Sequence, residues 1–89
     1  MAHISQAELA EALAEATRKV EVGAKYTHYR NPDQEYKVLH LGFLEASEEP
    51  CVIYQAQYGA EMIWVRAVSD WLARVGHEGR QVSRFSKVD

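Results

Sequence analysis

The residues of this chain best suited to chemistry are its aromatic and arginine side chains. Five tyrosines, two tryptophans and four histidines occur among 89 residues. Alternate residues of an extended strand share a face, which places Tyr26 with His28 and Trp64 with Arg66. Tyrosine, tryptophan and arginine dominate binding hot spots, so these residues indicate a binding surface. We expect six ligand-binding residues: Tyr26, His28, Tyr54, Trp64, Arg66 and Arg84.

A second interpretation of the same residues stays open. Tyrosine and tryptophan also fill small β cores, with their polar tips reaching water or the backbone, and Trp71 and Phe85 are the strongest core candidates. An arginine beside Trp64 or Phe85 can stack on the ring and grip an anion. It can instead form an internal ion pair, which we slightly favour. The acids for such a pair are Glu61, Asp70 and Glu35.

Patterns for catalysis and metal binding are weak in this sequence. The histidines are too dispersed for metal-ligand spacing; they are His3, His28, His40 and His77. The glycines do not form a phosphate-binding loop. Cys51 opens an apolar run, which favours a buried small hydrophobe over a nucleophile. We therefore predict no cofactor, no metal and no catalytic residue, and we favour a protein that is not an enzyme.

Composition limits the partners and the compartment. The formal charge of -3 lacks the basic excess that long nucleic acids require. A single cysteine rules out an intrachain disulfide and fits a reducing compartment. No apolar run approaches the roughly 18 residues of a membrane span, and the first residues lack a secretory signal. We predict a soluble, cytoplasmic protein with no membrane partner.

Residues 1 to 22 are predicted to hold one amphipathic helix, over residues 5 to 21. Ser5 followed by Glu8 makes a capping box at its start. A narrow apolar stripe follows at helical spacing, formed by Leu9, Leu13, Ala16 and Val20. The stripe must bury against the rest of the chain or against a second copy, which makes a homodimer through this helix one alternative.

Residues 23 to 89 are predicted to form a small, mainly β domain. Runs of β-branched and aromatic residues alternate with turn residues. Ser69 can cap a short helix that Gly76 ends. Short loops imply sequential antiparallel pairing. We expect an α+β fold containing an SH3-like five-stranded barrel or bent sheet; an open sheet with both helices on one face is the alternative. The expected strands are 25–30, 36–44, 51–58, 62–67 and 82–88, with the helix at 68–75.

Seven short motifs follow one another along the chain: Gly23 to Tyr29, Tyr36-Lys37-Val38, Val52-Ile53-Tyr54, Tyr58-Gly59, Trp64-Val65-Arg66, Gly79 and Arg84-Phe85. Their order resembles a small bacterial family catalogued as domain of unknown function 1653. The resemblance covers about residues 23 to 86. It implies a compact β domain and gives no activity. Ala67 and Ser83 stand where the family has prolines, and Gln55 stands where a basic residue is usual.

Three functions remain open at this point. The first, which we adopt, is a binding module that presents the aromatic and arginine surface to a peptide, a nucleotide or a short single strand. The second is a structural or interaction protein that self-associates or docks a partner through the N-terminal helix. The third is a small hydrolase with His28 or His40 as its base.

Overall fold

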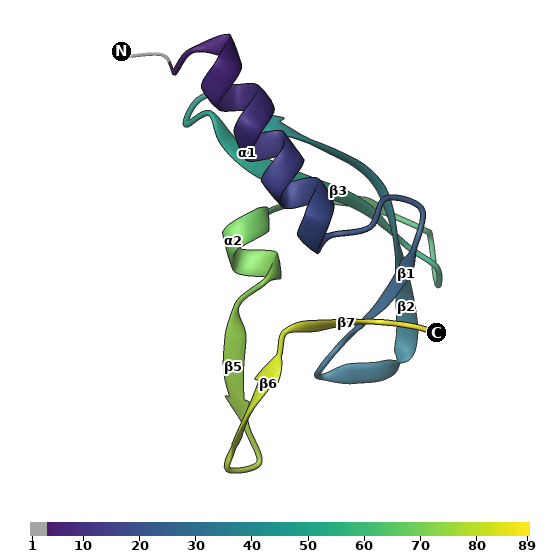
Figure 1. Ribbon diagram of the computed structural model, residues 1–89. Coiled ribbons are helices and arrows are strands. Elements are labelled where there is room, and N and C mark those ends of the chain that lie inside the picture. The colour runs from purple at the N-terminus through teal and green to yellow at the C-terminus, as the bar shows by residue number, and fades with distance from the viewer. Residues whose placement is uncertain (1–3) are drawn as a thin grey trace.

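The computed structural model describes residues 4–89, so the histidine at position 3 lies outside the described residues. Two helices and seven strands make up this part of the chain (Figure 1). The helices are α1 (Gln6–Lys19) and α2 (Val68–Trp71). The strands are β1 (Lys25–His28), β2 (Asn31–Leu44), β3 (Glu49–Ala56), β4 (Ile63–Ala67), β5 (Arg74–His77), β6 (Arg80–Ser83) and β7 (Phe85–Lys87).

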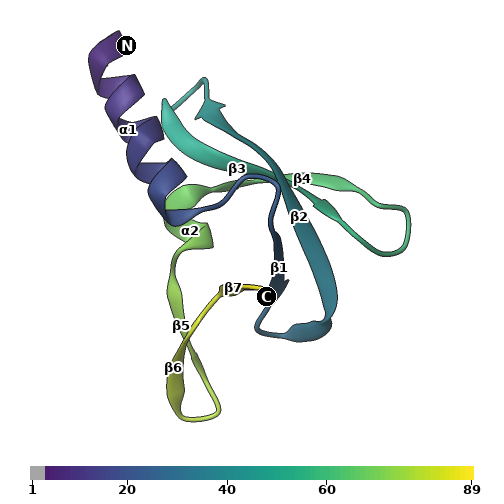
Figure 2. The same ribbon diagram turned by 45° about the vertical axis from the view of Figure 1, so that its right-hand side comes forward.

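Five of these strands form one antiparallel sheet in the order β4-β3-β2-β1-β7. The four strands between residues 24 and 67 pair with their sequence neighbours, as short loops require. The predicted α+β, mainly β fold is confirmed. The sheet is bent but does not close into a barrel, because β4 and β7 remain its two edges (Figure 2). A likeness to SH3 domains stays a prediction.

A β-bulge in β2 changes which of its residues face the core. Val38 lies opposite Tyr54, but the next paired residue, His40, lies opposite Ile53, so β2 carries one extra residue. One extra residue moves the following side chains to the other face. Val38 is therefore fully buried and Leu41 also packs against the core. A strict alternation along β2 would instead place Val38 and Leu41 on opposite faces.

Helix α1 begins as predicted and packs through its C-terminal part. The Ser5 side chain accepts the backbone N–H of Glu8, whose carboxylate accepts the N–H of Ser5, completing the capping box. Ala16 and Val20 are buried, whereas the first two residues of the apolar stripe are half-buried. The helix ends at Lys19, and Val20 is already extended. Helix α1 packs on β2 and β3 of its own chain.

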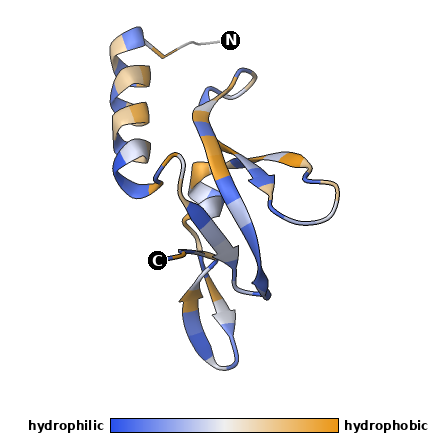
Figure 3. Cartoon of the chain, turned by 90° about the vertical axis from the view of Figure 1, so that its right-hand side faces the viewer, coloured by the Kyte–Doolittle hydropathy of each residue, from blue (hydrophilic) through white to orange (hydrophobic). Residues whose placement is uncertain are grey.

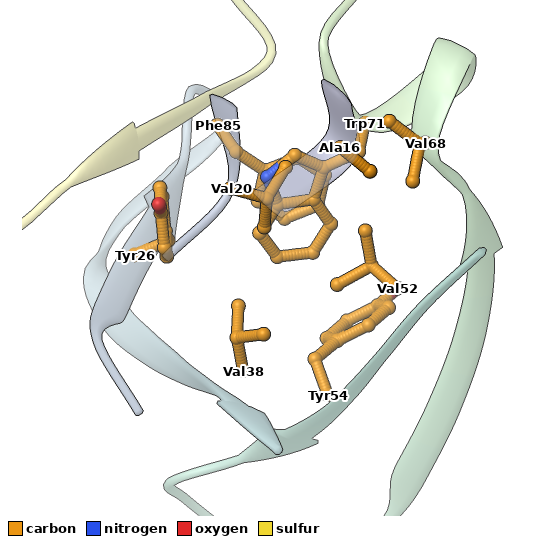
Figure 4. Close-up of a cluster of buried hydrophobic side chains, with 9 residues drawn as sticks. All are labelled: Ala16, Val20, Tyr26, Val38, Val52, Tyr54, Val68, Trp71 and Phe85. Carbon is orange, nitrogen blue, oxygen red and sulfur yellow. The ribbon is translucent and has the colours of Figure 1, made fainter. Parts of the chain in front are cut away.

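The core is built around two stacked rings. Trp71 and Phe85 lie parallel with their centroids 3.8 Å apart. Tyr26 and Tyr54 meet the Trp71 ring edge-on, at 5.3 and 4.9 Å. Because Trp71 lies in α2 and Phe85 in β7, an edge strand of the sheet, this stack joins α2 to the sheet. Figure 4 shows the cluster, which consists of Ala16, Val20, Tyr26, Val38, Val52, Tyr54, Val68, Trp71 and Phe85.

The region after residue 67 differs from the prediction. Helix α2 is only four residues long, and its N-cap is Ala67, without a side-chain cap. The predicted roles of Ser69 as cap and Gly76 as helix end were therefore wrong; Gly76 lies in β5. The predicted last strand is divided at Arg84, whose N–H donates to the carbonyl oxygen of Ala73 instead of a sheet partner.

The hairpin of β5 and β6 was missed by the sequence analysis. Its turn contains Glu78 and Gly79, both with positive φ. Two such residues in succession match the turn twist that hairpins favour. The hairpin projects away from the main sheet (Figures 1 and 2). Hydropathy is mixed along the elements (Figure 3), and no helix within residues 4–89 is long and apolar enough to cross a membrane.

Candidate functional site

Two of the six predicted site residues lie in the core. Tyr26 and Tyr54 are each 7% exposed, and their rings pack against Trp71. The Tyr26 hydroxyl accepts the backbone N–H of Glu21 at 3.0 Å, which ties the sheet to the end of α1. Both rings are therefore part of the core, as the second interpretation proposed. Neither ring offers an open face on which a ligand could stack.

Arg66 connects the end of β4 to the core. Its Nη1 lies 2.5 Å from Oδ2 of Asp70, which confirms the internal ion pair. Its Nε donates to the Tyr54 hydroxyl at 3.4 Å. The guanidinium carbon lies 5.3 Å from the centre of the Phe85 ring. Arg66 therefore stacks on Phe85 rather than on Trp64, its neighbour at two residues' distance.

Arg84 reaches the same carboxylate from the other side. Its Nη2 lies 3.6 Å from Oδ1 of Asp70. Its Nε is buried and has no hydrogen-bond partner among the described residues. Two guanidinium groups thus share one carboxylate and keep unused donors. Since each arginine carries a full positive charge and Asp70 offers one negative charge, this group is positive overall.

His28 lies beside these arginines and against Phe85, with ring centroids 5.0 Å apart. Burial lowers the pKa of His28, and the charges of Arg66, Arg84 and Arg30 lower it further. Its Nδ1 accepts the backbone N–H of Arg30 at 3.2 Å, so the proton of the neutral ring sits on Nε2. His28 is therefore a neutral hydrogen-bond donor at neutral pH.

The rings around His28 belong to one unbroken series of contacts, which we call the aromatic line. Successive centroids are separated by 5.6, 6.1, 5.0, 4.7 and 5.2 Å. Arg66 lies over one ring of the series and Arg30 over another, at 5.3 and 5.5 Å. The members, in order, are Tyr58, Tyr36, Phe85, His28, Tyr29 and His77.

The two tyrosines that begin the aromatic line are joined by their hydroxyls. The oxygens of Tyr36 and Tyr58 are 2.7 Å apart. Burial and this hydrogen bond raise the pKa of Tyr36 to about 12, so its phenol stays neutral. Tyr29, Tyr36, Tyr58 and His77 were not predicted as site residues; all but Tyr36, which lies within β2, are in or beside turns. Aromatic residues next to turn residues were the signal that was available.

Trp64 stands apart from the aromatic line. It lies opposite Tyr54 in the register of β3 and β4, but it is 54% exposed. Strand β4 is an edge of the sheet, so nothing in the sheet covers its outer side. The structure therefore brings together four of the six predicted residues at the aromatic line, namely His28, Arg66, Arg84 and the buried Tyr54, whose ring contacts those of Tyr36 and Phe85.

Cys51, which the sequence analysis weighed as a nucleophile, is buried in the structure. Cys51 is 3% exposed, and burial raises the pKa of its thiol, which disfavours the thiolate. Within residues 4–89, no three histidine, cysteine, aspartate or glutamate side chains form a group that could hold a metal ion. The chemistry that remains at the aromatic line is stacking, hydrogen bonding and anion attraction.

These features define a small α+β domain whose bent antiparallel sheet is held by an aromatic core. The chain belongs to the family described as a protein of unknown function, DUF1653, which matches residues 24–87. The match begins after α1 and includes both the core rings and the aromatic line. Neither curated proteins nor solved structures gave a significant match. The division into a helix at 1–22 and a β domain at 23–89 stays a prediction.

Proposed function

We propose that this protein is a binding module for a short single strand of nucleic acid or for a nucleotide, which it holds along the aromatic line. The observation that carries the proposal is the unbroken series of rings with arginines beside it. Successive bases stack on aromatic side chains, with about 1–3 kcal/mol per base. Guanidinium groups bind phosphate through paired hydrogen bonds.

The exposed part of the aromatic line is where a base would stack. Phe85 is buried and acts as the floor, whereas Tyr58 is exposed and Tyr29 and His28 are half-buried. Arg30 is exposed next to Tyr29, and its Nε donates to the Tyr29 hydroxyl at 2.9 Å. A base on Tyr29 would therefore place its phosphate near a guanidinium group.

Local charge supports a short anionic ligand although the whole chain carries -3. Arg30, Arg66 and Arg84 all act on His28, and Asp70 pairs with two of them. A phosphate can join this group by using the free donors of Arg84 and Arg66. The surrounding acidity disfavours a long duplex, because each further phosphate would meet negative charge. A few nucleotides are the ligand that fits best.

The test is a fluorescence titration with labelled single-stranded hexanucleotides. We expect binding that weakens as salt rises, and a loss of roughly 5- to 150-fold for Tyr29→Ala, which corresponds to the loss of about one stacked base. Arg18→Ala on α1 removes the same charge as Arg30→Ala but lies outside the aromatic line. It should leave binding unchanged, whereas Arg30→Ala should weaken it.

Two outcomes would reject the proposal. Equal losses for Arg18→Ala and Arg30→Ala would show non-specific charge attraction. Binding of an acidic peptide of equal charge, without binding of any oligonucleotide, would show that the ligand is a peptide. The alternative of docking through α1 has less support, because Ala16 and Val20 of its stripe are already buried in their own chain.

A further inference from the structure

Strand β4 exposes an unusual run of apolar residues at an edge of the sheet. Met62, Ile63, Trp64 and Val65 are consecutive and are 59%, 58%, 54% and 61% exposed. Edge strands of soluble proteins are usually protected by charges, proline or a bulge. This run contains neither a charge nor a proline, and β4 pairs with β3 without a register shift. Such a surface marks a site of protein association.

The register also shows which backbone groups of β4 point outward. The N–H of Ala56 donates to the carbonyl oxygen of Met62 at 3.0 Å, so Met62 directs its backbone groups toward β3. Alternate residues of an antiparallel strand direct both groups to the same side. The N–H and C=O groups of Ile63 and Val65 therefore face away from β3, at the open edge.

We propose that β4 pairs antiparallel with β4 of a second copy, symmetrically about Trp64, and so joins two sheets into one. In this register Ile63 lies opposite Val65 of the partner subunit, and Val65 lies opposite the partner's Ile63. Both pairs exchange two backbone hydrogen bonds, because these are the residues whose groups face outward. Trp64 lies opposite its own copy. A two-fold axis requires such self-complementarity.

The neighbouring registers fit less well. Pairing centred on Ile63 gives one hydrogen-bonded pair and places the carboxylate of Glu61 opposite Val65 of the partner subunit. Pairing centred on Val65 places Ile63 opposite the partner's Ala67, which is the last residue of β4 and the N-cap of α2, and places Trp64 opposite the charged Arg66 of the partner subunit. Only the register centred on Trp64 covers Ile63, Trp64 and Val65 with apolar partners, which is why we assign the edge to a second copy.

The size of the apolar run indicates a weak dimer. At exposures of 54–61%, these four side chains present roughly 450 Å² of apolar surface per subunit, from the ~150–250 Å² of a large side chain. A standard interface buries about 800 Å² per partner. We therefore expect association that depends on concentration. Since each subunit carries -3, salt should strengthen the dimer by screening repulsion, opposite to its effect on nucleic-acid binding.

Cysteine cross-linking tests the register directly. In the proposed dimer, position 64 faces its own copy as a non-hydrogen-bonded pair with Cα atoms about 4.5 Å apart, within disulfide range. Position 62 faces residue 66, so its copies lie about 13 Å apart along the strands. Trp64→Cys should form a disulfide dimer at least tenfold faster than Met62→Cys under mild oxidation. The parent chain, whose Cys51 is buried, should not cross-link.

Light scattering on the parent chain gives an independent readout. We expect a mass that rises toward twice that of the monomer with concentration, and a monomer for Val65→Lys with an unchanged circular dichroism spectrum. Equal cross-linking at positions 62 and 64, or a monomer at every concentration up to about 1 mM, would overturn the proposal. Neither Ile63 nor Val65 belongs to the aromatic line, so these results leave the proposed function untouched.

Discussion

Replacing Arg66 by alanine should destabilise the fold, because its side chain holds three elements together. The substitution removes the hydrogen bond to Tyr54, the ion pair with Asp70 and the contact with the Phe85 ring. The hydrogen bond is long and contributes about 0.5–1 kcal/mol. The ring contact contributes about 0.5–1 kcal/mol. The ion pair, whose side chains are 29% and 47% exposed, contributes about 0.5 kcal/mol.

The expected loss in the free energy of unfolding is therefore about 2 kcal/mol, or roughly 10 °C in Tm for a domain of this size. Urea denaturation followed by circular dichroism measures it. Arg74→Ala is the control, since this exposed arginine donates one hydrogen bond, to the carbonyl oxygen of Gln81, and should lose less than about 0.5 kcal/mol. A loss for Arg66→Ala as small as that of the control would refute the structural role that we assign to Arg66.

Two further predictions concern the helix and His28. Val20→Ala should cost about 2–3 kcal/mol, because Val20 is fully buried, and Leu13→Ala less, because Leu13 is half-buried; thermal melts that rank them in the opposite order would contradict this packing. The pKa of His28 is lowered from 6.5 by burial and nearby arginines, so the unfolded chain binds a proton first as pH falls. Stability should fall as pH decreases below about 6.5, and His28→Gln should flatten that slope in urea titrations between pH 5 and about 7.

Much of the fold could be predicted from local patterns. The capping box of Ser5 and Glu8 fixed the start of α1, and turn residues separated the strands that pair as neighbours. The bulge after Val38 could not be predicted from the alternation of apolar and polar residues along β2, because the extra residue is defined only by the pairing with β3. The β5–β6 hairpin was not predicted, because Gly76, which lies inside β5, was interpreted as the end of a helix.

The candidate site was harder to predict than the fold. Alternation along a strand shows which residues share a face, but not which face is buried, so Tyr54 and Trp64 were grouped although one is in the core and the other at an edge. The aromatic line joins residues from distant parts of the chain, such as Tyr29 and His77. Only the tertiary fold brings them together. The ion pair of Arg66 with Asp70 was predictable, because Asp70 was one of the acidic residues proposed as a partner for an internal arginine.

Mapping a bound oligonucleotide by NMR tests the central claim most directly. Single-stranded hexanucleotide would be titrated into the isotopically labelled protein, and the shifts of its backbone amide signals recorded. We predict that the largest shifts fall on residues 28–30, 58, 77 and 84–85, around the aromatic line, with little change along the exposed face of α1. Shifts confined to α1 and to residues 62–65, or no shifts at millimolar ligand, would contradict the account.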